Sequence, residues 1–121
     1  MDHQLSRNEF DDAIATLNTC DRIIVEGKKD VRSLSSLGVP HSKLLPLNGA
    51  PLYTILDAVL PRSNVALLTD LDGEGKKLHA KLKPELVKKG VFVDEKFREF
   101  LFRRTPVRVI EGLEGFVEKL E

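Results

Sequence analysis

Cysteine is nearly absent from this sequence, and so are long apolar runs. Cys20 is the only cysteine among 121 residues, so no disulfide can form within the chain and a metal site built from several thiolates is excluded. The apolar runs are only a few residues long, whereas a membrane-spanning helix needs roughly 20 apolar residues. The first ten residues hold charged side chains and no apolar core, so we expect no signal peptide. We therefore expect a soluble, cytoplasmic protein with no membrane partner.

Several motifs of known chemistry are also missing. The sequence has no G-x-x-x-x-G-K-[ST] motif, and no predicted strand is followed by G-x-G-x-x-G. The three histidines, His3, His41 and His79, lack the spacing of a metal site and give no basis for a Ser-His-Asp triad. A P-loop, a dinucleotide-binding turn and triad catalysis are therefore not indicated.

The chain has no net charge, but its charges are unevenly distributed. Residues 76–108 contain 11 Lys and Arg against 4 Asp and Glu, whereas residues 1–75 contain 7 against 11. A protein that binds polyanions over its whole surface is normally more basic overall. The basic segment is compatible with a local phosphate-binding face, and equally with solvated helix surfaces.

Apolar spacing divides the chain into alternating helices and short strands. Ser6 and Glu9 have the S-x-x-E spacing of a capping box, which predicts a first helix over about 7–17. Pro84 is predicted to interrupt the basic helix that follows Gly75 and to begin a new short one. Strands are expected at 22–26, 44–47, 64–69, 91–93 and 107–110, and further helices at 29–37, 52–59, 94–104 and 113–120.

This alternation predicts an α/β fold, with helices on both faces of a mostly parallel sheet of four to five strands. We expect one domain over residues 1–121, because the chain is too short for a second core of ordinary size. In parallel sheets, ligands bind beyond the carboxyl ends of the strands. Acidic residues at strand ends are therefore the first candidates for a site.

Two predicted strands end in carboxylates. Glu26 closes one strand, Asp70 closes another, and Asp72 follows two residues later. Carboxylates that meet at one sheet edge repel each other, and a hard cation such as Mg²⁺, with Mn²⁺ as a substitute, removes that cost. Gly27, Gly73 and Gly75 let the loop backbones turn sharply and admit a phosphate. The pattern predicts a metal site.

Each acid also has a structural interpretation. Asp72 could cap the helix that begins near Gly73, and Glu26 could pair with Lys28 or Lys29. Asp30 could cap the second helix or assist the metal as a supporting acid, and we favour the cap.

The sequence resembles the Toprim domain family. The resemblance lies in IIVEGKKD at 23–30, LNG at 47–49 and LLTDLDGEG at 67–75, and it extends over a core of about 21–112. The stand-alone size and the EGKKD form are most similar to the small Toprim ribonucleases that mature ribosomal RNA. This resemblance implies a compact Rossmann-like sheet and a nucleic-acid substrate.

It further implies that Glu26 is a general acid or base, or a metal ligand, and that Asp70 and Asp72 hold Mg²⁺. We therefore predict a Mg²⁺-dependent nuclease or nucleotidyl-transfer domain, with Lys28 and Lys76 as candidate phosphate contacts. The chain lacks the added RNA-binding region of a maturation nuclease, so RNA or DNA would be recognised by the basic segment or by a partner protein.

Two alternatives remain open. One is a non-catalytic module that binds nucleic acid or metal within a larger complex. The other is an aspartyl-phosphate phosphatase, because D-L-D-G at 70–73 also resembles the nucleophile loop of that superfamily. The phosphatase is disfavoured, since no later strand ends in an acidic pair and Glu26 would have no role.

Overall fold

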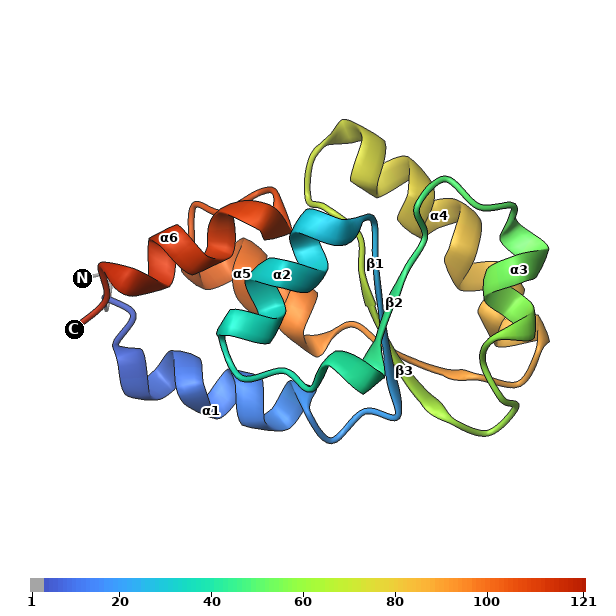
Figure 1. The fold of residues 1–121 in the computed structure, drawn as a ribbon, viewed down its shortest axis with the longest axis horizontal. Coiled ribbons are helices and arrows are strands. Elements are labelled where there is room, and N and C mark those ends of the chain that lie inside the picture. The colour runs from blue at the N-terminus through green and yellow to red at the C-terminus, as the bar shows by residue number, and fades with distance from the viewer. Residues whose placement is uncertain (1–3) are drawn as a thin grey trace.

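The computed structural model describes residues 4–121, so the first three residues of the predicted domain lie outside the described part. A central sheet separates two groups of helices, and the start of the first helix lies beside the C-terminus at one end of the molecule (Figure 1). The strands are β1 (Arg22–Val25), β2 (Leu44–Pro46), β3 (Asn64–Leu68) and β4 (Phe92–Asp94). The helices are α1 (Arg7–Leu17), α2 (Lys28–Ser36), α3 (Leu52–Asp57), α4 (Gly73–Lys88), α5 (Lys96–Arg104) and α6 (Leu113–Glu118), with 3₁₀ turns η1 (His41–Lys43) and η2 (Ile110–Gly112).

The sheet contains four strands in the order β2-β1-β3-β4, and every neighbouring pair is parallel. This confirms the predicted α/β class with helices on both faces. Val25 pairs with Leu68 where β1 and β3 end together. The residues that follow these two strands therefore leave the sheet side by side.

Alternate residues of the strands face two separate apolar cores. On one face, Ile23 and Leu68 join the buried side chains of α1, α2, α5 and α6. On the other face, Ile24 and Leu67 pack with α3 and α4. All four of these side chains are fully buried, as expected for parallel strands covered on both sides.

Local signals explain the first helix. The Ser6 hydroxyl accepts a hydrogen bond from the Glu9 amide at 3.1 Å, and the Glu9 carboxylate accepts one from the Ser6 amide at 3.1 Å. This is the predicted capping box, and α1 has the predicted bounds.

No helix within the described residues is both long and apolar enough to cross a lipid bilayer.

The structure corrects the prediction that Pro84 begins a new helix. Helix α4 continues through Pro84 as one helix, from Gly73 to Lys88. Proline cannot donate the usual hydrogen bond to the carbonyl of Ala80, but both residues are exposed, so water can satisfy that carbonyl. Burial of Leu82 and Leu86 on the inner face holds the helix together.

A second correction concerns the strand predicted at 107–110. The segment is irregular and leads into the 3₁₀ turn η2. Its backbone bonds to the loop after β3 instead of to a strand: the Leu71 amide donates to the Arg108 carbonyl at 2.7 Å, and the Ile110 amide donates to Asp70 Oδ1 at 2.7 Å. The apolar pattern was right about burial of Ile110 but wrong about its partner.

Candidate metal centre

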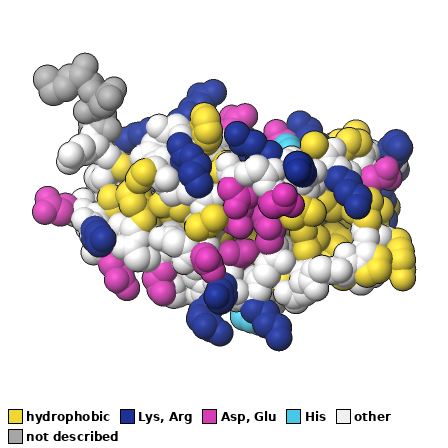
Figure 2. Space-filling model, turned by 90° about the horizontal axis from the view of Figure 1, so that it is seen from above, with side chains coloured by type: hydrophobic (Ala, Val, Ile, Leu, Met, Phe, Trp, Pro, Cys, Tyr) yellow, Lys and Arg dark blue, Asp and Glu magenta, His cyan; other side chains and the backbone are white. Residues whose placement is uncertain are grey.

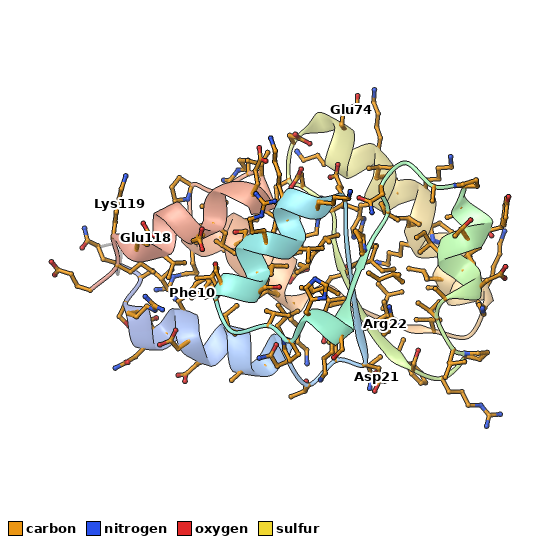
Figure 3. All side chains as sticks on the ribbon, in the orientation of Figure 1. Phe10, Asp21, Arg22, Glu74, Glu118 and Lys119 are labelled. Carbon is orange, nitrogen blue, oxygen red and sulfur yellow. The ribbon has the colours of Figure 1, made fainter. Side chains whose placement is uncertain are left out.

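The carboxyl ends of β1 and β3 bring three acids together. One carboxylate oxygen from each of Glu26, Asp70 and Asp72 lies within 4.8 Å of the other two. We call these residues the acidic cluster. Strand β1 runs from Arg22, at the bottom of the view, toward the edge at which Glu74 lies (Figure 3). Seen from above that edge, Asp and Glu side chains form a patch with Lys and Arg on two sides (Figure 2).

Each carboxylate of the acidic cluster is held by one backbone amide. Glu26 Oε2 accepts from the Asp70 amide at 2.6 Å, and Asp70 Oδ1 accepts from the Ile110 amide at 2.7 Å. Asp72 Oδ1 accepts from the Gly75 amide at 2.8 Å. Within residues 4–121, the second oxygen of each carboxylate has no hydrogen-bond donor. Three oriented carboxylates thus keep one oxygen each for a ligand.

The cluster carries negative charge that is only partly compensated. The pKa of Asp70 is raised to about 6, mainly by burial and also by the charges of Glu26, Asp30 and Asp72, although the hydrogen bond from the Ile110 amide lowers it. A carboxyl group whose pKa is raised toward neutrality is typical of sites that bind cations or transfer protons.

Arg98 supplies a positive charge behind this loop. Its Nε donates to the Thr69 carbonyl at 3.1 Å and its Nη2 donates to the Asp70 carbonyl at 3.0 Å. Burial lowers the pKa of Arg98, while Glu95, Glu26 and Asp70 raise it. Sequence reasoning did not single out Arg98, because nothing in the local pattern of α5 indicates a contact with a loop 28 residues earlier.

Only one of the three predicted loop glycines is required by space. A Cβ at Gly75 would lie 1.9 Å from the Asp70 carbonyl oxygen, which no side chain can accommodate. At Gly73 a Cβ would meet nothing within 4 Å, and at Gly27 it would lie 4.0 Å from Asn48 Oδ1. Gly75 therefore allows α4 to begin directly against the acidic loop.

The contacts of the acids test their structural interpretations. Asp72 does cap α4, through its bond to the Gly75 amide, and it belongs to the acidic cluster as well. In the described part of the chain, Glu26 forms no ion pair with Lys28 or Lys29. Asp30 is buried and accepts from the Gly27 amide at 3.0 Å, which is the favoured capping role.

The candidate phosphate contacts lie on two different helices. Lys28 is exposed at the start of α2 and lines a groove beside β2. Lys76 is exposed in the first turns of α4 and lines a pocket of about 370 Å³ with Arg98 and Phe102. Both side chains are without an ion-pair partner among residues 4–121. Their proposed roles stay predictions.

Glu26 also borders a pocket between α3 and α4. The pocket has a volume of about 320 Å³, and its walls are mostly apolar, including Leu52 and Leu78. Lys81 is the basic residue that lines it. A ligand at the acidic cluster therefore has apolar space beside the Glu26 carboxylate.

Sequence and structure comparisons identify relatives over most of the chain. A UPF0292 protein of Methanocaldococcus jannaschii is 37% identical over 101 residues, which cover 80% of this chain and 78% of the relative. A UPF0292 protein of Archaeoglobus fulgidus is 31% identical over 100 residues, covering 81% and 77%. A solved structure of a protein from Aquifex aeolicus has a TM-score of 0.74 at 30% identity, covering 86% of this chain and 94% of that one.

These comparisons correct the family assignment. No family model matches the chain, and its relatives carry the UPF0292 name, so the assignment to the Toprim family and its ribosomal-RNA-maturing branch is wrong. The physical reason is that the motifs are short. A glutamate before a glycine at one strand end, and an N-cap aspartate after another, suit any parallel sheet with a tight turn into a helix. They describe a site and do not specify a family.

Proposed function

The chain belongs to the UPF0292 family, and from the geometry of the acidic cluster we propose that it is a Mg²⁺- or Mn²⁺-dependent enzyme that cleaves phosphodiester bonds in nucleic acid. The observation that carries the proposal is the set of three amide-anchored carboxylates, from two neighbouring strand ends, with their oxygens within 4.8 Å. Ligands held by surrounding hydrogen bonds are a general feature of metal sites.

The donor set suits a small hard cation. All three donors are carboxylate oxygens, which Mg²⁺ and Mn²⁺ prefer to nitrogen or sulfur. At Mg–O distances of about 2.0–2.1 Å, two oxygens on one ion lie about 2.9 Å apart when adjacent and about 4.1 Å when opposite. The three oxygens lie within 4.8 Å of one another, so their widest separation is at most about 0.7 Å above the value for an opposite pair. Because Asp72 is exposed, a small rotation of its side chain or an intervening water can close the difference.

The chain's own groups can then bind and activate a phosphate. Asp70 and Asp72 would hold the ion, which would supply stabilisation of the negative charge that develops on the phosphate. The first amides of α4 point toward this edge of the sheet and favour an anion there. Glu26 exchanges a proton with the attacking water or with the leaving oxygen as the P–O bond breaks. Such proton transfer typically accelerates a reaction by about 10²–10⁴-fold.

The test is cleavage of end-labelled RNA and DNA, single- and double-stranded, with Mg²⁺ or Mn²⁺ and with EDTA. We expect metal-dependent products from the wild-type protein, and their loss in Asp70→Asn and Glu26→Gln. Asp12→Asn, which removes an exposed carboxylate on α1, is the matched control and should retain full activity.

Cleavage that survives in Asp70→Asn would reject the proposal. Binding of metal and nucleic acid without any cleavage would support a non-catalytic module instead. A burst of product from p-nitrophenyl phosphate, with phosphate retained on Asp70, would support the aspartyl-phosphate mechanism.

A further inference from the structure

A basic groove lies between α2 and the edge strand β2, outside the acidic cluster. Its volume is about 530 Å³, and it is lined by the basic side chains of Lys28, Arg32 and His41 and by the apolar side chains of Val31, Leu44 and Pro46. We call this the Arg32 groove. No carboxylate lines it, in contrast to the pocket beside Lys76, which contains Glu95 and Glu99.

The charges of the Arg32 groove favour an anion. Lys28 and Arg32 are four residues apart on α2, so they share one face of the helix and repel each other. Both side chains are exposed, and across residues 4–121 neither forms an ion pair. An anion in the groove would relieve this repulsion, and no group among residues 4–121 forms an ion pair that does so.

The Arg32 groove is continuous with the acidic cluster. Asn48 lines the groove, and its backbone amide donates to the backbone carbonyl of Glu26 at 3.0 Å. Lys28 begins α2 only two residues after Glu26. Figure 2 shows Lys and Arg side chains beside the acidic patch. A molecule that is held at the acidic cluster can therefore extend into the groove without leaving the surface.

We propose that the Arg32 groove binds the phosphodiester backbone of a nucleic-acid strand next to the phosphate held at the acidic cluster. This inference rests on the proposed function and makes it more specific, because a mononucleotide has no second phosphodiester to place in the groove. The substrate is then a polynucleotide that continues past the reacting phosphate. The apolar side chains of the groove contact sugar and base surfaces, while Lys28 and Arg32 contact backbone oxygens.

The experiment measures oligonucleotide binding as a function of salt. Labelled 12-mers of uridine and of thymidine are titrated by fluorescence anisotropy from 50 to 200 mM KCl, with Ca²⁺ in place of Mg²⁺ to suppress turnover. The variant is Lys28→Gln/Arg32→Gln. The control is Arg7→Gln/Lys119→Gln, which removes the same two residue types near the chain termini, where the Arg7 amide meets the Glu121 carbonyl (Figure 3).

Each lost single-strand phosphate contact lowers the slope of log K against log salt by about 0.7, so we expect a decrease of about 1.4. At 0.1 M salt this corresponds to about 25-fold weaker binding of the 12-mers. The control should bind as the wild type does. Calorimetry should show that binding of Mn²⁺ alone is not weakened in either variant. Uridine 5′-monophosphate should compete poorly and equally with all three proteins.

Three results would overturn the proposal: no binding of either 12-mer by the wild type, an unchanged salt slope in Lys28→Gln/Arg32→Gln, or equal binding of poly-glutamate. The two 12-mers separate RNA from DNA. Metal-dependent cleavage with an unchanged salt slope would reject strand binding in the Arg32 groove and leave the proposed function intact. A salt slope that decreases in Lys28→Gln/Arg32→Gln, in a protein that cleaves neither RNA nor DNA, would support binding in the groove and reject the proposed cleavage.

Discussion

Replacement of Asp70 by Asn should stabilise the metal-free protein at neutral pH. The pKa of Asp70 rises from 3.8 to about 6, first because of burial and then because of neighbouring negative charges. At about 1.36 kcal/mol per pKa unit, ionising this group at pH 7 would cost the fold about 3 kcal/mol. Asp70 is partly exposed, and solvent screening reduces the cost to about 1.5 kcal/mol. Asn keeps an oxygen for the Ile110 amide and carries no charge.

The sign of the pH dependence follows from proton binding. Because its pKa is raised in the folded state, folded Asp70 binds more protons than unfolded Asp70 between about pH 3.8 and pH 6. Its contribution to stability is therefore fully present below this window and is lost as the pH rises through it. Urea unfolding at pH 4 and pH 7 should show similar stability for wild type and Asp70→Asn at pH 4. At pH 7 the variant should be more stable by about 1.5 kcal/mol, or about 6 °C in Tm.

Added metal should cancel most of the advantage. At Mg²⁺ concentrations tenfold above Kd, binding adds about 1.4 kcal/mol to the stability of the wild type, and Asp70→Asn should gain little. Asp12→Asn is the control and should differ from the wild type at neither pH. A variant that is less stable than the wild type at pH 7 without metal would refute the charge repulsion on which this reasoning depends.

Three further measurements test the acidic loop and the apolar core beside α1. Gly75→Ala should lose most of its folded stability, because its Cβ would lie 1.9 Å from the Asp70 carbonyl oxygen. The free energy of unfolding of Gly73→Ala, whose Cβ would have nothing within 4 Å, should be within about 0.5 kcal/mol of the wild-type value, and equal urea midpoints for the two variants would contradict this. Arg98→Gln removes two charge-assisted hydrogen bonds to loop carbonyls, so it should lower the free energy of unfolding in urea by about 2 kcal/mol and weaken Mn²⁺ binding in calorimetry. An unchanged urea midpoint would show that these hydrogen bonds do not support the loop. Burial, with the nearby Asp94 carboxylate, raises the pKa of the Cys20 thiol to about 11. The thiol should therefore not react with Ellman's reagent at pH 8 until the protein unfolds, and rapid reaction of the native protein would contradict the packing of the core beside α1.

The elements that sequence predicted well are those with local signals. Helix α1 has a capping box at its start, and α2 ends next to Gly38, whose φ of +99° suits glycine. Strands β1 and β3 are short apolar runs that are buried on both faces. The meeting of Glu26 with Asp70 also followed from sequence, because parallel strands end at one edge.

The contacts that sequence could not predict are long-range ones. Arg98 reaches the loop after β3 from α5, the third element after that loop, and no periodic pattern encodes that contact. The family was also beyond reach, since a few acids and glycines at strand ends recur in unrelated parallel sheets. The continuation of α4 through Pro84 depends on the burial of its inner face, which overrides a local helix-breaking signal.

The wrongly predicted strand at 107–110 is informative about the site. In a strand, the Ile110 amide would bond to a neighbouring strand, and Asp70 Oδ1 would lose the donor that orients it. Instead two backbone groups of the segment form hydrogen bonds with the acidic loop: the Ile110 amide donates to Asp70, and the Arg108 carbonyl accepts from the Leu71 amide. Places where local sequence preference yields to tertiary contacts are often functional. Here the irregular backbone orients the Asp70 carboxylate, whose negative charge is unfavourable in the folded protein. A bound cation would offset that unfavourable charge.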